Sequence, residues 1–246
     1  MPTSFAGGIT IGSGAVAALG LAAGAFAYAS RWPASQIFGR TLVAPRRPGE
    51  LALTFDDGPN PACTPRLLDI LARHEVRATF FLVGWFAQQE SGLARSIAAA
   101  GHLVGNHSWS HPDLSIIAAR RIRDELARTK DTLEQITGNP VRFFRPPHGA
   151  RRPYVLRVAR ELGMTPVMWN AMTRDWSEHN PDRIAARLAR KIGANQRRGY
   201  ASNIVLHDGG HLALNTDRGL SIAAAENLLA RYAHTHKFVT VDDWTC

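Results

Sequence analysis

The sequence contains little cysteine. Of its 246 residues two are Cys, and they stand far apart, at Cys63 and Cys246. One pair allows a single bridge at most, which excludes both a disulfide framework and a zinc finger built on cysteines. We expect two unpaired thiols.

Internal repeats and long polar tracts are also lacking. Hydrophobic residues make up 45% of the chain and charged residues 20%, with 21 Gly and 14 Pro. These proportions exclude a disordered, collagen-like or coiled-coil chain, and the lack of a repeat period excludes a solenoid. The length suits one large domain or two small ones with a sizeable core.

The chain has fewer acidic than basic residues, with 20 Asp and Glu and 29 Lys and Arg. Its formal net charge is therefore +9. The basic residues are nearly all Arg and occur as short pairs, such as Arg46-Arg47 and Arg197-Arg198, with acidic residues between the pairs. A nucleic-acid-binding surface would concentrate them. We therefore favour a solvated basic exterior and expect no nucleic-acid partner.

No charged residue precedes Arg31. The uncharged run over residues 8–29 would be about 33 Å long as a helix, just enough to span a bilayer. It predicts a membrane anchor or signal segment over residues 1–30. The Ala-Tyr-Ala sequence at 27–29 is similar to a signal-peptidase site, although residues 1–7 lack the usual basic n-region.

The residues that follow this segment do not decide on which side of the membrane the domain lies. Arg31, Arg40, Arg46 and Arg47 all follow it, and the positive-inside rule would keep that side cytoplasmic, whereas an export signal would place it outside. Residues 31–50 are rich in Pro and show no periodicity, which predicts a linker. The main folded domain is then expected over 51–246.

Strand-like and helical patterns alternate along residues 51–246. The strand-like runs cover 51–55, 78–83, 102–104, 141–144, 165–169, 203–206 and 238–241, and the helical patterns cover 65–74, 88–100, 118–137, 153–162, 181–192 and 220–234. About seven strands alternating with helices predict an α/β fold with a parallel sheet, closed or nearly closed into a barrel. Chemistry in such a barrel lies at the carboxyl ends of the strands.

Two adjacent carboxylates, Asp56 and Asp57, end the first predicted strand, directly before the turn-forming pair Gly58-Pro59. Neighbouring like charges repel each other. They are tolerated when a cation lies between them, or when one faces a metal and the other an Arg. A turn or helix cap is the simpler interpretation of Asp57 taken alone.

His107 and His111 follow the third predicted strand, four residues apart, a spacing that brings both imidazoles to one side of a helical turn. Such a pair alone carries little information in a chain with ten His. With Asp57 it forms a set of two His and one carboxylate, which leaves positions open for water and substrate on zinc or another divalent metal. The set therefore favours a catalytic site.

Polar residues also end three later strands, as Arg145 in Arg145-Pro146-Pro147-His148-Gly149, as Asp175-Trp176, and as Leu206-His207. A His directly after an apolar strand, with an Asp at the same face of the barrel, fits a general acid oriented by a carboxylate. A structural hydrogen bond between the His and the Asp, and an ordinary surface Arg, are the alternatives.

Together these motifs resemble the polysaccharide deacetylases of carbohydrate esterase family four, also called the NodB-homology domain. The resemblance covers residues 51–241 and rests on five motifs in the order of the family, at 54–59, 107–111, 145–149, 175–176 and 206–207. It implies a distorted (β/α) barrel, often of seven strands, that uses a divalent metal to hydrolyse N-acetyl groups from amino sugars. Zn²⁺ is the expected metal, with Co²⁺ and Mn²⁺ as alternatives.

The resemblance also implies individual roles. Asp57, His107 and His111 would be the metal ligands. Asp56 would be the base that deprotonates the attacking water, and Arg145 would hold Asp56. This division is chemically coherent, because a Lewis acid and a positioned base generate hydroxide near neutral pH.

By the same resemblance, His207 would be the general acid that protonates the leaving amine, and Asp175 would tune it. Trp176 and Leu206 would wall the acetyl pocket. The oxyanion donor would be the backbone N–H of His148. Protonation is needed because an amide nitrogen leaves only as a neutral amine.

Two positions depart from the pattern of the family. His148 stands where the family usually has Tyr or Phe, and Met172 stands where many members have a further Asp before the Asp-Trp pair. Both bear on the substrate more than on the reaction. His211, which ends the stretch that begins at Leu206-His207, has no assigned role.

We expect a membrane-associated, metal-dependent deacetylase that acts on the amino sugars of a glycan, either peptidoglycan or a chitin-like oligosaccharide. A deacylase of a lipid-linked sugar at the membrane is one alternative, and a catalytically silent glycan-binding barrel is the other. The expected location is extracytoplasmic, anchored or secreted. The oligomeric state is left open.

Overall fold

The structure is a computed structural model that describes residues 13–245, with side chains from Gly20 onward. The helices are α1 (Ser13–Arg31), α2 (Thr64–Arg73), α3 (Gly84–Gln89), α4 (Ser91–Ala99), α5 (Ala119–Thr137), α6 (Pro153–Glu161), α7 (Pro181–Arg197) and α8 (Gly219–Tyr232), with 3-10 turns η1 (Pro147–Gly149) and η2 (Val241–Trp244). The strands are β1 (Glu50–Asp56), β2 (Thr79–Leu82), β3 (Leu103–Asn106), β4 (Phe143–Phe144), β5 (Thr165–Pro166), β6 (Ala171–Met172), β7 (Ser202–His207) and β8 (Lys237–Val239).

Local sequence signals set several helix ends. Pro occupies the first turn of α2, α6 and α7, where a backbone N–H would have no acceptor within the helix. The side chain of Asn180 caps α7 by accepting hydrogen bonds from the backbone N–H groups of Asp182 and Arg183. At the other end of α5, Gly138 adopts a φ of 70°, the left-handed conformation that stops a helix.

The strands form one parallel sheet in the order β5-β4-β3-β2-β1-β7-β6, and β8 pairs with the first half of β1. The centre is β1, whose second half pairs with β2 while its whole length pairs with β7. In this register Asp56 lies opposite His207. The parallel α/β architecture expected from the alternation is confirmed.

The sheet curls because its two outermost strands are neighbours in the chain. β5 and β6 stand at opposite ends of the strand order, yet only residues 167–170 separate them. Four residues span at most about 14 Å, so the two edges must approach each other. The result is a distorted barrel of parallel strands, in agreement with the expected fold.

Two predicted elements are each divided in the structure. The strand expected over 165–169 becomes β5, which pairs with β4, and β6, which pairs with β7, because this segment crosses from one sheet edge to the other. The helix expected over 88–100 becomes α3 and α4, which are separated at Glu90 by a non-helical backbone (φ −110°, ψ 47°). Hydrophobic periodicity indicates neither break.

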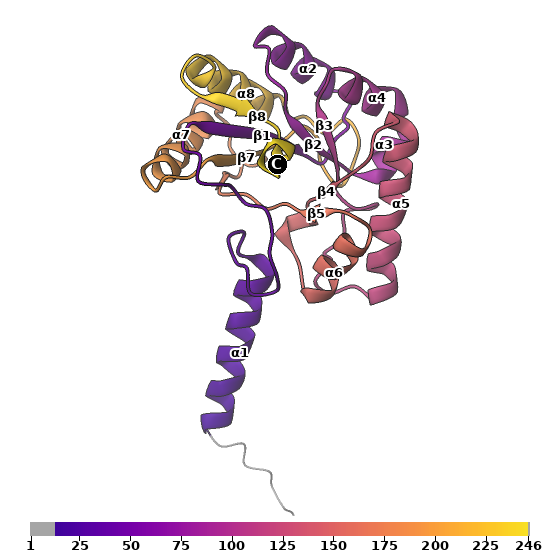
Figure 1. Cartoon of the computed structure of the whole chain (residues 1–246), viewed down its shortest axis with the longest axis vertical. Coiled ribbons are helices and arrows are strands. Elements are labelled where there is room, and N and C mark those ends of the chain that lie inside the picture. The colour runs from indigo at the N-terminus through magenta and orange to yellow at the C-terminus, as the bar shows by residue number, and fades with distance from the viewer. Residues whose placement is uncertain (1–12, 246) are drawn as a thin grey trace, which may run out of the picture.

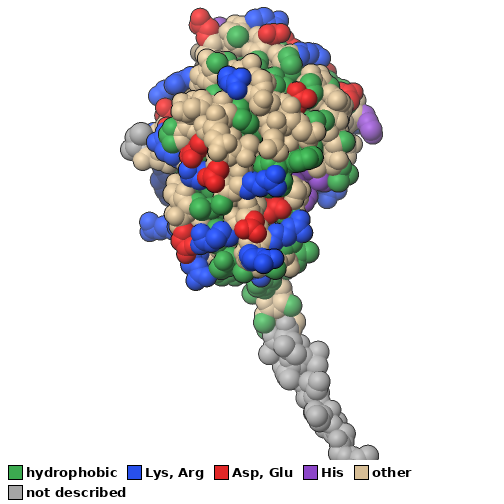
Figure 2. Space-filling view, turned by 90° about the vertical axis from the view of Figure 1, so that its right-hand side faces the viewer, with side chains coloured by type: hydrophobic (Ala, Val, Ile, Leu, Met, Phe, Trp, Pro, Cys, Tyr) green, Lys and Arg blue, Asp and Glu red, His purple; other side chains and the backbone are tan. Residues whose placement is uncertain are grey.

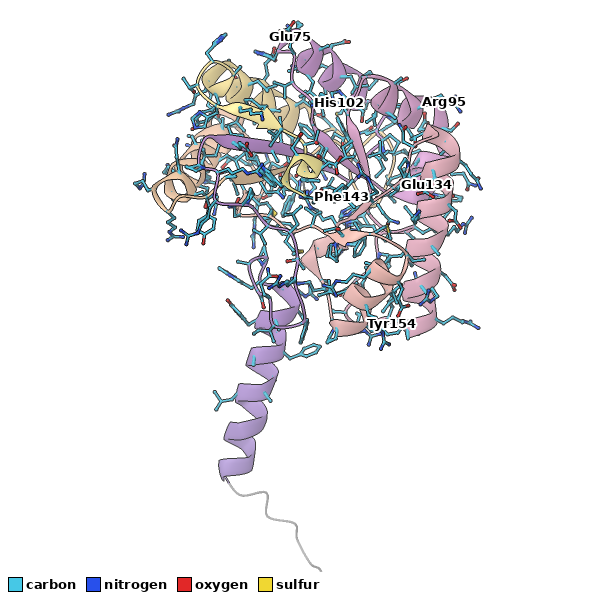
Figure 3. All side chains as sticks on the ribbon, in the orientation of Figure 1. Glu75, Arg95, His102, Glu134, Phe143 and Tyr154 are labelled. Atoms are coloured by element: carbon cyan, nitrogen blue, oxygen red, sulfur yellow. The ribbon has the colours of Figure 1, made fainter. Side chains whose placement is uncertain are left out.

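Successive side chains of β1 point alternately into two parts of the hydrophobic core. Leu51, Leu53 and Phe55 pack in the main cluster between the sheet and the helices, whereas Ala52 lies in a smaller cluster with Phe143 inside the barrel. Figure 3 shows Phe143 near the middle of the domain. Because side chains alternate across a strand, Asp56 shares the inner face with Ala52.

The end of α1 is fixed to the domain by a buried arginine. Arg151 is 1% exposed, and its guanidinium donates to the carbonyl oxygens of Ser30 at 3.4 Å, Trp32 at 2.7 Å, Ser35 at 2.9 Å and Gly149 at 3.0 Å. The segment expected as a linker therefore lies against the domain. Figure 1 shows the rest of α1 projecting away from it.

The expected N-terminal membrane or signal segment lies partly outside the described residues, which begin at Ser13. From there to residue 245, no helix combines the length and the apolar character needed to cross a bilayer. That residues 1–30 form a membrane anchor or signal segment stays a prediction. Of the two cysteines, Cys63 is a buried free thiol, and Cys246 lies outside the described residues.

The surface in Figure 2 mixes charges of both signs. Lys and Arg side chains lie among Asp and Glu side chains on this face, with no continuous basic stripe. Ion pairs such as Arg142–Asp242 and Arg73–Glu226 join exposed Arg side chains to half-buried carboxylates. This face has the character of a solvated exterior.

Candidate metal and catalytic site

The polar residues predicted at strand ends meet in one cleft of about 510 Å³. Asp56 and Asp57 come from the end of β1, His107 and His111 from the loop after β3, and His207 from the end of β7. His148 in η1 and Trp176 after β6 complete this part of the lining. Parallel strands all end on the same side, so residues far apart in the sequence converge there.

Asp57, His107 and His111 form a compact buried cluster whose ligand atoms lie within 4.8 Å of one another. The Oδ1 atom of Asp57 lies 3.4 Å from Nε2 of His107 and 3.1 Å from Nε2 of His111. Asp57 and His111 both adopt positive φ, at 71° and 56°. Non-glycine residues in this region store strain, which is typical of functional sites.

The orientation of His107 is set by a backbone carbonyl. Its Nδ1 lies 2.8 Å from the carbonyl oxygen of Arg145. That oxygen can only accept, so Nδ1 carries the proton and Nε2 turns its lone pair toward Asp57. This is the tautomer that a metal ligand requires.

The cluster fits a divalent metal ion. Oδ1 of Asp57 and Nδ1 of His111 are buried without a hydrogen-bond partner. Burial alone would raise the pKa of Asp57, but the facing imidazoles of His107 and His111 outweigh it and hold that pKa well below its usual value. Burial lowers the pKa of His111. One carboxylate and two imidazoles form a donor set suited to zinc and similar ions.

Asp56 is held by the fully buried Arg145. Nη1 of Arg145 donates to Oδ1 of Asp56 and to Oγ1 of Thr54, both at 2.7 Å, and Nη2 donates to Oδ1 of Asn203 at 3.2 Å. The guanidinium lies 4.2 Å from the ring centre of Phe81. Sequence reasoning missed Thr54 and Asn203 as partners, although both are polar residues inside strand-like runs.

His207 and Asp175 form a second ion pair across the cleft. Nδ1 of His207 lies 2.9 Å from Oδ1 of Asp175, and the backbone N–H of His207 donates to Oδ2 at 2.9 Å. Ser221, which sequence reasoning also missed, donates to the same oxygen at 2.6 Å. Burial would lower the pKa of His207, but the charge and hydrogen bond of Asp175 prevail and raise it to about 9.

Two further imidazoles surround His111. The ring of His148 lies 4.5 Å and that of His211 4.6 Å from the His111 ring, measured between centroids, and Nδ1 of His211 lies 3.9 Å from Oδ2 of Asp57. Burial, followed by the neighbouring imidazoles, lowers the pKa of His148 to about 4. His211, unassigned by sequence, thus belongs to the cleft.

Three predicted site residues do not line the cleft. Arg145 and Asp175 are bound to the lining residues Asp56 and His207. The third is Leu206. It is fully buried in the main core cluster with Leu53 and Phe55, on the face of β7 turned toward the helices. Its neighbour His207 points to the other face, because side chains alternate along a strand. Trp176 does line the cleft, with its ring centre 5.0 Å from that of His207.

Other cleft residues carry no clear sequence signal. Arg31 reaches the cleft from the end of α1, Trp169 from the segment between β5 and β6, and Arg174 and Arg218 from loops. Arg31 is also paired with Asp113, two residues after His111. Only the docking of α1 on η1 brings Arg31 there.

Gly209 permits the close approach of the two loops that carry Asp57 and His207. A Cβ atom at this position would lie 2.2 Å from the carbonyl oxygen of Asp57 and 2.6 Å from its carbonyl carbon. Real Cβ atoms do not come so close to backbone, so any side chain here would displace Asp57. Gly209 is the second residue after the end of β7.

Comparison with known proteins identifies the family. A sequence profile described as polysaccharide deacetylase matches residues 44–167. Chitooligosaccharide deacetylase of Azorhizobium caulinodans is 35% identical over 174 residues, which make up 70% of this chain and 80% of the relative. The chain belongs to the polysaccharide deacetylase family. It is accordingly an enzyme of the hydrolase class.

Solved structures extend the similarity over the barrel. The Bc1960 peptidoglycan N-acetylglucosamine deacetylase has a TM-score of 0.71 and 31% identity, and the match covers 82% of this chain and 91% of that one. A mutant of BA3943 from Bacillus anthracis, described as a pseudoenzyme of carbohydrate esterase family four with restored activity, has a TM-score of 0.72 and 31% identity, over 83% and 70% of the two chains.

The first prediction concerns metal binding by this deacetylase. Asp57→Ala should weaken zinc binding at least about 100-fold, because it removes an anionic ligand. Asp56→Asn should stay within about tenfold of the unaltered protein, because Asp56 is engaged by Arg145. Titration of metal-free protein with zinc measures both.

Asp124→Asn, at an exposed position on α5, is the matched control and should bind zinc normally. Normal zinc affinity of Asp57→Ala would contradict the assignment of Asp57 as a ligand.

Proposed function

We propose that the protein removes N-acetyl groups from amino sugars of peptidoglycan or of a chitin-like oligosaccharide. The observation that carries this proposal is the presence of two buried ion pairs, Asp56–Arg145 and His207–Asp175, beside the cluster formed by Asp57, His107 and His111. Amide hydrolysis needs a base for the attacking water and an acid for the leaving nitrogen. The cleft offers both.

Asp56 is the proposed base. Arg145 donates a hydrogen bond to its Oδ1, which leaves Oδ2 to accept a proton from water. Asp57, His107 and His111 would hold the divalent metal, and Zn²⁺ suits this donor set best, with Co²⁺ and Mn²⁺ as alternatives. When bound, the metal supplies Lewis-acid polarisation of the water and of the acetyl carbonyl.

His207 is the proposed acid. Its pKa of about 9 keeps the imidazolium charged at neutral pH, so that it can give a proton to the amine as the C–N bond breaks. Asp175 orients it, and Trp176 contacts it from the side of the solvent. The backbone N–H of His148, at the rim of the cleft, is the proposed oxyanion donor.

A lipid-linked amino sugar is the second candidate substrate. The observation that favours it is Arg31, which lies at the end of α1 and lines the cleft. If α1 continues into a membrane, the cleft opens close to the bilayer surface. A silent glycan-binding barrel, the third interpretation, is disfavoured because the proposed acid His207, the proposed base Asp56 and the Asp-His-His cluster all line one cleft. The family nevertheless includes the BA3943 pseudoenzyme.

Catalysis is tested by Asp56→Asn, which removes proton acceptance and nearly preserves shape. Turnover of an acetylated chito-oligosaccharide should fall by about 10²- to 10⁴-fold, while the metal stays bound. Acetate release and metal content are measured on the same preparation. Full activity of Asp56→Asn would refute the role of the base.

The pH dependence tests the acid. In the unaltered enzyme, activity should decline as the pH rises through about 9, where His207 loses its proton. In Asp175→Asn the stabilising charge is gone and burial favours neutral imidazole, so the decline should move to lower pH by at least about one unit. The profile of kcat against pH measures the shift.

Ser221→Ala, which removes only one hydrogen bond to Asp175, should move the decline less. An unchanged profile in Asp175→Asn would show that His207 is not the acid.

We infer that the N-terminal segment holds the enzyme at a membrane, with the domain on the extracytoplasmic side. Supporting this, the uncharged run over 8–29 contains Phe26 and Tyr28 near its end, and Trp32 follows it. These side chains are 51%, 50% and 55% exposed. Aromatic residues favour the interface between membrane and water.

The full chain should therefore sediment with membrane fractions, and deletion of residues 1–27, which leaves the docked Ser30 in place, should release it. N-terminal sequencing of the mature protein is the second measurement. A soluble mature protein that begins at Ser30 would show that the segment is a cleaved signal, and protection of the domain from protease in intact cells would place it on the cytoplasmic side.

A further inference from the structure

A second hollow of about 460 Å³ adjoins the catalytic cleft and shares Met172 and Arg174 with it. Its walls come from the loop after β6 and from one face of α7. We call it the basic groove and define it by Thr173, Arg174, Glu178, Arg187, Arg190 and Lys191. All of these residues lie beyond the segment 44–167 that matches the family profile.

The basic groove carries an excess of positive charge. Arg187, Arg190 and Lys191 follow one another at the spacing i, i+3, i+4, which puts them on the same face of α7. Arg187 is paired with Glu178, with 2.9 Å between Nη1 and Oε2. Within residues 20–245, no carboxylate forms an ion pair with Arg174, Arg190 or Lys191. Three exposed cations therefore face the hollow uncompensated.

A buried hydroxyl without a partner lies in the same place. Thr173 is 9% exposed and lines the basic groove, and its Oγ1 is buried with no hydrogen-bond partner. Buried hydroxyl groups are rarely left unpaired in folded proteins. A donor surrounded by cations is suited to an oxyanion.

We propose that the basic groove binds an anionic oxygen group, a carboxylate or a phosphate, on the same glycan whose N-acetyl group occupies the catalytic cleft. The shared residues Met172 and Arg174 allow one extended substrate to fill both hollows. Arg side chains recognise carboxylate and phosphate alike through paired N–H donors. This proposal rests on the proposed function, and it names acidic amino-sugar glycans as the preferred substrates.

The first test compares three acetylated oligosaccharides of equal length: a neutral one, one with a carboxylate on a sugar next to the acetylated residue, and one with a phosphate there. The value of kcat/KM for acetate release by the metal-loaded enzyme should be about tenfold higher for one or both anionic substrates, mainly through a lower KM. At about 1 M salt the Debye length falls to about 3 Å, so most of the preference should disappear.

The second test removes the charge of the groove. The double variant Arg190→Ala/Lys191→Ala should raise KM for the preferred anionic substrate by about five- to tenfold, with kcat unchanged and with normal kinetics on the neutral substrate. Arg66→Ala/Arg120→Ala, on the exposed surfaces of α2 and α5, changes the net charge equally and should leave both substrates unaffected.

The outcomes separate the two proposals. Absence of acetate release from all three substrates by the metal-loaded enzyme overturns the proposed function. Release at equal rates from the neutral and both anionic substrates overturns the basic groove alone. A preference for the carboxylate points to an acidic sugar or an attached peptide, and a preference for the phosphate points to a lipid-linked sugar. A preference that survives in Arg190→Ala/Lys191→Ala also overturns the role of the groove.

Discussion

A full positive charge buried inside the barrel is the constraint on which the site depends. Arg145 is completely buried, and a charge in such a place needs partners because water cannot solvate it. Asp56, Thr54 and Asn203 supply them from β1 and β7, and the carbonyl oxygen of Arg145 orients His107. Breaking a buried pair of this kind typically costs about 3–5 kcal/mol, so the strand ends are held firmly in one arrangement.

The cleft near this arginine keeps two buried ionisable side chains charged, with opposite signs. Asp57 faces two imidazoles and stays an anion, whereas His207 faces Asp175 and stays a cation. Burial works against the charge in both cases, and a specific partner reverses its effect. Both charges matter for the proposed roles, because a carboxylate that binds a metal must be ionised and a general acid must carry its proton.

Much of the fold could be predicted from local patterns, because strand-like and helical runs alternate strongly after Leu51. The pattern could not indicate that the segment after Met164 divides into β5 and β6, since that division arises only when the two edges of the sheet meet. Nor could it indicate that the residues before Leu51 pack against the domain. That packing depends on Arg151, which is distant in the sequence and binds three carbonyl groups there.

The sequence by itself determined the family resemblance and the candidate metal cluster, because Asp57, His107 and His111 follow strands in a characteristic order. Tertiary structure alone decided which side chains support them. Ser221 reaches Asp175 from α8, and Arg31 reaches the cleft from the opposite end of the chain. It also turned Leu206 toward the core, away from the cleft. The motifs indicate where strands end. Which distant side chains contact the motif residues depends on the curvature and register of the barrel, and no local stretch of sequence encodes these.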